Sequence, residues 1–243
     1  MQPDYWLPRP APEPDAATQA AFDALLDAAV AAGPNTLLEY TLAAPKWQFL
    51  CHVADRRGVA LHGSGRADIA RFEPRQPQDL NAFGAQNAVY AAADGLWPMY
   101  FAIIDRGRYD MTLSNACVRL AEPGQVHGPF YLFSVSAEAC RQRPWRPGVV
   151  YLLPRATFVE QAPQPFGPYE VRIPQLASLA PVTPLARLVV APEDFPFLDD
   201  IRGHDDARLQ EYATAMQTGG PWPEAAGARG VLPDRPGGRA RHG

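Results

Sequence analysis

Apolar side chains recur at intervals of three and four residues in two segments near the start of the chain, as on one face of an α-helix. The first predicted helix begins at a cap on Asp15 and ends just before Gly33. The second begins at Pro45, which suits a first helical turn, and ends just before Gly58. Later helices are predicted over residues 94–104 and 205–217.

Short apolar runs between glycine-, proline- and polar-rich stretches predict β-strands. The clearest is the run from Val59 to His62, which stops at the tight turn Gly63-Ser64-Gly65. The other predicted strands cover residues 36–42, 87–92, 130–135, 149–153, 170–173 and 185–190. Helices and strands do not alternate regularly in this order, so the sequence predicts an α+β fold and not a doubly wound sheet.

Proline is frequent, with 27 among the 243 residues, and it disfavours long helices in the second half of the chain. The sequence predicts four parts. Residues 1–33 form a proline-rich arm with a helix, and residues 34–200 form the α+β domain. Residues 201–218 form a C-terminal helix, and residues 219–243 form a disordered tail rich in Pro, Gly and Arg.

Charge and cysteine usage exclude several classes of protein. The net charge of -4 lacks the basic excess that is typical of nucleic-acid binding. The chain has three cysteines, Cys51, Cys117 and Cys140, and they are widely spaced. An odd number at this spacing indicates neither a disulfide framework nor a zinc ribbon. The spacing of the histidine and carboxylate residues does not indicate a metal site either. Neither a signal peptide nor an apolar run of about 20 residues is recognisable, so we expect a cytoplasmic protein without a membrane partner.

Candidate chemistry gathers at the ends of two predicted strands. His62 ends the first and can project into a cleft, Gly63 lets a ligand approach the backbone, and Ser64 adds a hydroxyl group. Tyr90 on the next strand can stack on a flat ligand, and Tyr100 on the following helix can cover its other face. Taken singly, each aromatic residue is better explained as part of the core.

The combination is more informative than its members. The chain contains, in this order, His62-Gly63-Ser64, a long loop, Phe83-Gly84 and an apolar-Tyr90-Ala segment before a helix. This arrangement resembles the first two signature motifs of the ADP-ribosyltransferase superfamily. The resemblance is closest to the poly(ADP-ribose) polymerase type and related bacterial proteins. It implies an ADP-ribosyltransferase-like split mixed sheet with peripheral helices, and NAD as the substrate.

The same resemblance implies roles for individual residues. His62 would bind the ribose and amide side of NAD, and the backbone of Gly63 would clamp the nicotinamide carboxamide. Tyr90 would stack on the nicotinamide ring, with Tyr100 as the second ring and Ser64 near the nicotinamide ribose. His62 and Tyr90 are therefore expected on adjacent strands, with their side chains lining one cleft.

The third signature of the family is a glutamate at the head of a late strand. Glu170 is the preferred candidate, Glu160 is the second, and Gln175 is the alternative that would keep hydrogen bonding without the charge. A second departure is the stretch Trp97-Pro98-Met99, where polymerase-type members usually have a serine. A glutamine in the third motif would favour a weak, altered or inactive enzyme.

The resemblance predicts NAD-dependent transfer of ADP-ribose to an unknown protein or nucleic-acid acceptor, or hydrolysis of NAD, with His62, Tyr90 and Glu170 as catalytic residues. A non-catalytic module that binds NAD or a partner on the same fold is the alternative. A purely structural module, in which the aromatic residues belong to the core, is the third interpretation.

Overall fold

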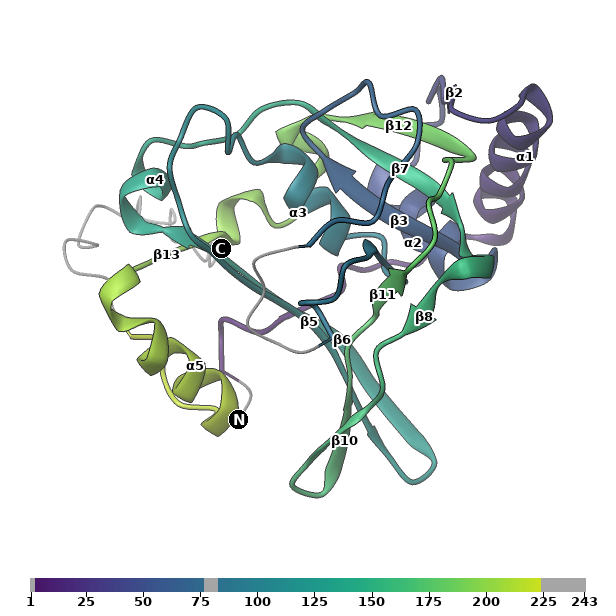
Figure 1. The fold of residues 1–243 in the computed structure, drawn as a ribbon. Helices are drawn as coiled ribbons and strands as arrows, with labels where there is room; N and C mark the ends of the chain where they lie inside the picture. The colour runs from purple at the N-terminus through teal and green to yellow at the C-terminus, as the bar shows by residue number, and fades with distance from the viewer. Residues whose placement is uncertain (1–2, 77–82, 224–243) are drawn as a thin grey trace, which may run out of the picture.

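The computed structural model describes residues 3–76 and 83–223, and it contains two β-sheets with helices between and around them (Figure 1). The larger sheet has seven strands, in the order β2 (Thr36–Leu37), β12 (Ala186–Val190), β7 (Gly148–Pro154), β3 (Val59–Ser64), β4 (Val89–Ala92), β11 (Gln175–Ser178) and β8 (Val159–Glu160). The smaller sheet has six, in the order β1 (Leu7–Pro8), β6 (Gln125–Ser136), β5 (Leu113–Glu122), β10 (Tyr169–Arg172) and β9 (Gln164–Phe166), with β13 (Arg202–His204) also beside β6. The predicted α+β class is confirmed.

Five α-helices accompany the sheets: α1 (Ala16–Ala32), α2 (Lys46–Arg56), α3 (Trp97–Ile103), α4 (Ala137–Arg141) and α5 (Leu209–Thr218). Asp15 caps α1 as predicted, because its side chain accepts a hydrogen bond of 2.8 Å from the backbone N–H of Thr18. Short 3-10 turns follow β7, β12 and β13, at Arg155–Thr157, Pro192–Asp194, Leu198–Asp200 and Asp206–Arg208.

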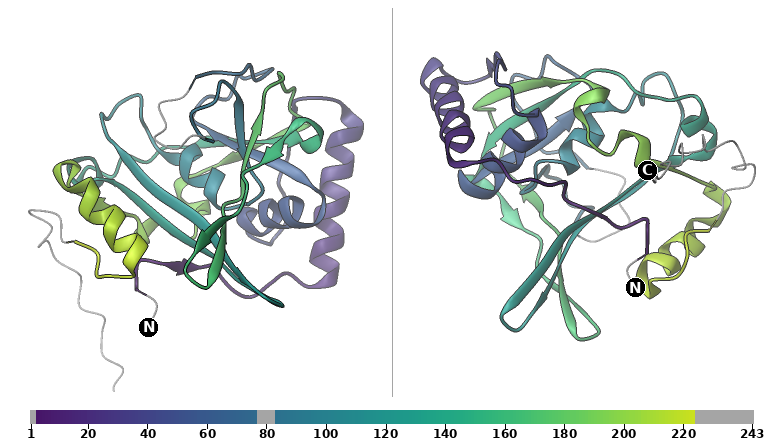
Figure 2. Two further views of the ribbon diagram at one scale, coloured as in Figure 1. Left: turned by 60° about the horizontal axis from the view of Figure 1, so that its bottom comes forward. Right: turned by 180° about the vertical axis from the view of Figure 1, so that it is seen from behind.

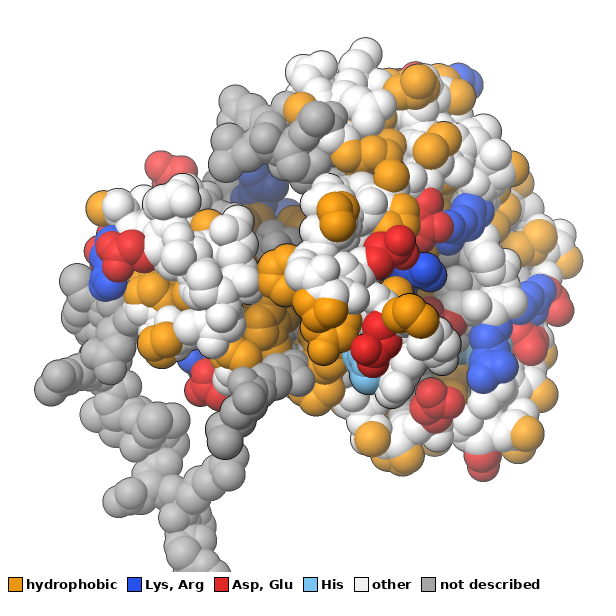
Figure 3. All heavy atoms as spheres, turned by 90° about the horizontal axis from the view of Figure 1, so that it is seen from below, with side chains coloured by type: hydrophobic (Ala, Val, Ile, Leu, Met, Phe, Trp, Pro, Cys, Tyr) orange, Lys and Arg blue, Asp and Glu red, His pale blue; other side chains and the backbone are white. Residues whose placement is uncertain are grey.

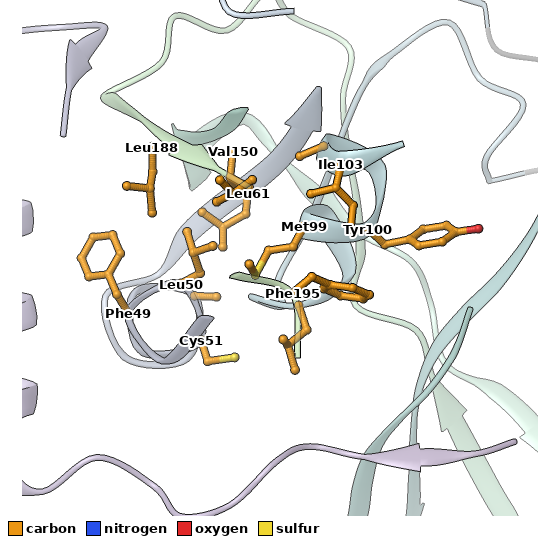
Figure 4. Close-up of a cluster of buried hydrophobic side chains, with 14 of the residues drawn as sticks. Phe49, Leu50, Cys51, Leu61, Met99, Tyr100, Ile103, Val150, Leu188 and Phe195 are labelled. Carbon is orange, nitrogen blue, oxygen red and sulfur yellow. The ribbon is translucent and has the colours of Figure 1, made fainter. Parts of the chain in front are cut away.

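Helix α3 lies between the two sheets, where it forms the centre of the larger core (Figures 1 and 2). Its residue Tyr100 is fully buried, and the Tyr100 ring lies 4.9 Å from the ring of Phe133 on β6. Side chains of α2, β3, β7 and β12 pack in the same core as Met99 and Ile103 of α3 (Figure 4). A second, smaller core lies on the opposite face of the seven-stranded sheet, where Phe72 and Val182 cover β3, β4 and β7.

The long β5–β6 hairpin differs most from the sequence expectation. No strand was predicted over β5, and β6 begins at Gln125 rather than near Phe130. Most of β5 is half-buried and carries polar residues, so its hydrophobic signal is weak. The turn at Pro123-Gly124 is the signal that predicts such a hairpin.

The C-terminal boundary also lies later than expected. The ring of Trp222 packs against Tyr212 on α5 at 4.6 Å and against Tyr5 at 5.3 Å. The hydroxyl of Tyr5 donates to the carbonyl of Ala215 at 2.8 Å. Trp222, within the predicted disordered tail, therefore packs against the fold, and residues 224–243 of that tail lie outside the described residues.

Surface charges are mixed in sign on the face seen from below (Figure 3), where Lys and Arg side chains lie beside Asp and Glu side chains. This agrees with the near balance of charge in the sequence. In the described part of the chain, no helix combines the length and apolarity that a bilayer crossing requires.

The N-terminal arm runs across the back of the smaller sheet (Figure 2, right) and ties α3 to it. The buried carboxylate of Asp94, just before α3, accepts hydrogen bonds from the backbone N–H groups of Leu96 and Trp97, both at 2.9 Å. It also accepts from the hydroxyl of Tyr131 at 2.7 Å and the guanidinium of Arg9 at 3.1 Å. The arm thus supplies the cation for a buried anion that caps α3.

Arg9→Ala should therefore lower the free energy of unfolding by about 3 kcal/mol, because it leaves the Asp94 carboxylate buried without its positive partner. Urea denaturation measures this loss. Arg119→Ala is the matched control, since Arg119 contacts only the half-exposed Asp55, at 3.5 Å, and should cost less than about 1 kcal/mol. Equal losses for the two variants would contradict the role assigned to Arg9.

Candidate functional site

The candidate site lies where β3 and β4 separate. Strand β3 pairs with β7 along its whole length, from Val59 to Ser64. Its pairing with β4 is limited to one position, Leu61 opposite Ala92, while β4 continues its pairing with β11. Beyond Leu61 the edge of β3 is therefore open, and a cavity occupies the gap.

This cavity has a volume of about 470 Å³, which is within the range of ligand pockets. Strands β3, β4 and β11, helix α3 and the chain after α3 provide its walls. Its lining residues include His62, Gly63, Ser64, Gly65, Tyr90, Trp97, Pro98, Phe101, Arg106, Arg146 and Gln175. His62, Gly63, Ser64 and Tyr90 are the motif residues predicted to meet, and the structure brings them together.

His62 bridges the gap between the strands. Its Nδ1 atom lies 2.6 Å from the carbonyl oxygen of Tyr90, which can only accept, so Nδ1 carries a proton and donates it. Burial lowers the pKa of His62 below its ordinary value, so the ring is neutral at pH 7. A neutral ring with a proton on Nδ1 has a lone pair on Nε2. In the part of the chain that the structure describes, no residue forms a hydrogen bond with this Nε2 atom.

The two rings point to opposite sides of the sheet although they line one cavity. The ring of His62 lies 4.6 Å from that of Phe72, in the smaller core. Val89 and Ala91, the neighbours of Tyr90, also pack in that core, so strand alternation directs Tyr90 to the other side. The two strands are adjacent as predicted and both residues line one cavity, but the side chains lie on opposite faces of the sheet, which contradicts the arrangement that the resemblance implies. A ligand would have to lie in the gap between the strands to contact both rings.

Tyr90 is held by the loop before β4. Its hydroxyl lies 2.9 Å from the carbonyl oxygen of Phe83 and 3.0 Å from that of Gln86. Because the hydroxyl is anchored at the loop, the ring has a fixed position beside the cavity.

Gly63 is required by helix packing. A Cβ atom on Gly63 would lie 1.8 Å from the carbonyl oxygen of Pro98 in the first turn of α3. Any side chain would push α3 away from β3 and change the width of the cavity. The hydroxyl of Ser64 accepts a hydrogen bond of 3.1 Å from the backbone N–H of Arg66, so it supports the turn after β3.

The second ring of the cavity is not Tyr100. Tyr100 is completely buried in the core, where its hydroxyl donates to the carbonyl of Ser134 at 2.7 Å, and it does not line the cavity. Phe101, the next residue on α3, lines the cavity together with Trp97. Trp97 is fixed by a hydrogen bond of 2.6 Å from its indole N–H to the side chain of Asn115. The sequence prediction was wrong by one residue along the helix.

Both predicted carboxylates lie away from the cavity. Glu170 is on β10 in the other sheet and forms an ion pair with Arg172 at 2.9 Å. Glu160 lies on the edge strand β8, where it pairs with Arg155 at 2.9 Å. Gln175 is the only one of the three candidates that lines the cavity, from the start of β11 opposite Ala92.

Two arginines are among the residues that line the cavity, Arg106 and Arg146, and none of its described lining residues is acidic. Arg146 forms an ion pair of 3.4 Å with Asp105, which is next to Arg106 in the chain. A second cavity of about 430 Å³ adjoins it and shares His62, Ser64 and Tyr90. Sequence reasoning missed both arginines, because neither belongs to a motif.

Within residues 3–76 and 83–223, no group of three or more His, Cys, Asp or Glu side chains could hold a metal ion. Comparison with known proteins gives no match, whether with protein-family models, curated proteins or solved structures. What the cavity binds has therefore to be inferred from its own residues.

The state of His62 is directly measurable. Its ring should titrate below the ordinary pKa of 6.5, and its neutral form should carry the proton on Nδ1, because burial lowers the folded pKa. As the pH falls, His62 takes up a proton in the unfolded chain before it does so in the folded chain. Its contribution to the stability of the fold is therefore complete above about pH 6.5 and is lost progressively below that pH. Nitrogen-15 NMR of the ring, assigned with His62→Gln, tests the prediction. A titration midpoint of the His62 ring at or above that of an ordinary histidine would contradict it.

Proposed function

We propose that the chain binds NAD by its nicotinamide end in the cavity between β3 and β4, and that it transfers ADP-ribose from NAD to an acceptor. One observation carries this proposal. One cavity is lined by His62, Gly63, Tyr90 and Gln175, which lie on the adjacent strands β3, β4 and β11. The first three belong to the segments that resemble two motifs of the ADP-ribosyltransferase superfamily.

The arrangement offers each part of NAD a suitable contact. Tyr90 and Phe101 provide aromatic surfaces for the flat nicotinamide ring. The lone pair on Nε2 of His62 can accept a hydrogen bond from a ribose hydroxyl. Because His62 and Tyr90 also line the adjoining cavity, the rest of the dinucleotide has room on the far side of the gap.

Gln175 determines how the reaction would proceed. When the bond between the anomeric carbon and nicotinamide breaks, its electron pair goes to the ring nitrogen and positive charge develops on the ribose. A carboxylate beside the ribose would stabilise that charge, whereas the Gln175 amide offers hydrogen bonds and a dipole only. We therefore propose slow turnover that depends on orientation of the ribose and on binding of the leaving group.

A non-catalytic NAD-binding module is the second candidate. It is favoured by the same feature, since no described residue that lines the cavity is acidic. The two candidates share the nicotinamide site and differ in turnover.

Calorimetric titration with NAD tests the shared site. Tyr90→Leu and Phe101→Leu should each weaken NAD binding roughly 2- to 13-fold, because each removes an aromatic contact of about 0.5–1.5 kcal/mol. Glu170→Gln is the control and should leave binding unchanged, since Glu170 lies in the other sheet. Absence of NAD binding to the unaltered chain would overturn both candidates.

Nicotinamide release, followed in the same samples, separates the two candidates. Gln175→Glu should raise the rate if the chain is a transferase, because it supplies the missing charge. No release from either the unaltered chain or Gln175→Glu, with NAD bound, would leave the non-catalytic module.

A further inference from the structure

A row of four residues crosses one face of the seven-stranded sheet and ends behind the cavity. Leu61 on β3 lies opposite Ala92 on β4, and Ala92 lies opposite Gln175 on β11. Gln161, the residue after β8, comes next, because its backbone N–H donates to the carbonyl of Gln175 at 3.0 Å. The first three residues line the cavity, whereas Gln161 does not. Gln161 therefore lies behind Gln175 as seen from the cavity.

The side chains of Gln161 and Gln175 lie on the same face of the sheet. Leu176 packs in the smaller core on the opposite face, so alternation along β11 directs Gln175 to the face that α3 covers. Residues opposite one another in an antiparallel pair project from the same face, with their Cβ atoms about 5 Å apart. The two side-chain amides are therefore within reach of each other.

The Gln161 amide is buried, and its oxygen has no partner. Gln161 is 6% exposed, and its Oε1 atom accepts no hydrogen bond from any residue in the described ranges. Buried acceptors without a partner are rare in folded proteins. The other neighbour of Gln175 in the row is Ala92, which has no polar side-chain atom. Within the row, the NH2 group of Gln175 is thus the one side-chain donor that can reach this oxygen.

The orientation of the Gln175 amide decides what it offers a substrate. Its oxygen is the negative end of the amide dipole, and its NH2 group is the positive end. Positive charge that develops on the ribose is stabilised by the oxygen and opposed by the NH2 group. A carboxylate has two equivalent oxygens and needs no such choice, whereas an amide needs a neighbour that fixes its orientation.

We propose that Gln161 is a positioning residue, whose Oε1 atom accepts a hydrogen bond from Nε2 of Gln175 and thereby turns the Gln175 oxygen to the ribose of NAD. This inference rests on the proposed function. Gln161 does not line the cavity, so it acts through Gln175 and not on the substrate. The bond satisfies a buried acceptor and gives the neutral amide the orientation that a glutamate would not need.

Gln161→Met tests this role, because it removes the acceptor and keeps the length of the side chain. We expect kcat for nicotinamide release to fall about 2- to 13-fold, the range that corresponds to one neutral hydrogen bond. KM for NAD should stay unchanged, since Gln161 does not contact NAD. Gln164→Met is the matched control and should leave both constants unchanged, because Gln164 is exposed on β9 in the other sheet.

The same substitution in the Gln175→Glu variant separates positioning from a structural role. Because the two oxygens of a carboxylate are equivalent, Gln161→Met should then lower kcat about twofold at most. A structural role predicts the same loss in both backgrounds, together with a lower melting temperature.

A second measurement does not depend on turnover. Nitrogen-15 NMR of the Gln175 side-chain NH2 group, assigned with Gln175→Glu, reports how fast its protons exchange with water. With NAD bound, we expect one of these protons to exchange slowly in the unaltered chain and in Gln164→Met. In Gln161→Met this protection should be lost.

Two results would overturn the inference. One is equal proton exchange at Gln175 in the unaltered chain and in Gln161→Met. The other is a rise in KM for NAD at unchanged kcat, which would assign Gln161 to binding alone. If NAD binds without release of nicotinamide, the exchange measurement decides. If NAD does not bind, the proposed function fails, and exchange in the free chain still shows whether the two amides are bonded.

Discussion

The hydrogen bond from Nδ1 of His62 to the carbonyl of Tyr90 is the interaction on which the site depends. At this point the ladder between β3 and β4 has ended, and an imidazole replaces the backbone donor that a continuous sheet would provide. The two strands are thereby held at a fixed separation with a gap between them. The same bond fixes the tautomer of His62, so that its remaining nitrogen is an acceptor beside two adjoining cavities.

Helix α3 forms the opposite wall of the gap, and two contacts at its N-terminal end determine its position. The buried Asp94 carboxylate caps it and connects it to Arg9 in the N-terminal arm. The close contact of Gly63 with Pro98 sets its distance from β3. Phe101 consequently lies in the cavity while Tyr100 fills the core, so a single helix serves both stability and the proposed binding of nicotinamide.

Sequence reasoning recovered the parts of the site that depend on local pattern. The strand that includes His62 and Gly63 and the strand that carries Tyr90 are both present. The sequence analysis assigned Gly63 to close approach of a ligand, whereas in the structure the carbonyl oxygen of Pro98 occupies the place of its Cβ atom. The sequence analysis named Tyr100 as the second ring, whereas Phe101 lines the cavity. The two positions are adjacent on one helix, and a rotation of one residue separates the side that faces the core from the side that faces the cavity.

Features that depend on tertiary packing could not be predicted. The three candidates for the third motif, Glu170, Glu160 and Gln175, all belong to segments that form strands. Only the order of the strands in the two sheets shows that Gln175 lines the cavity. Arg106 and Arg146 line one cavity because β7 pairs with β3 while α3 packs against both strands, an arrangement that no local pattern encodes. None of the described residues that line this cavity is acidic.

The central claim is that the gap between β3 and β4 is a nicotinamide site, and a crystal structure of the chain with nicotinamide bound tests it most directly. We predict that the ring lies between Tyr90 and Phe101, with its carboxamide at the end of β3 near Gly63. Density for the ring at any other place, such as the surface hollow beside Glu170, with the gap filled by protein side chains, would contradict the account.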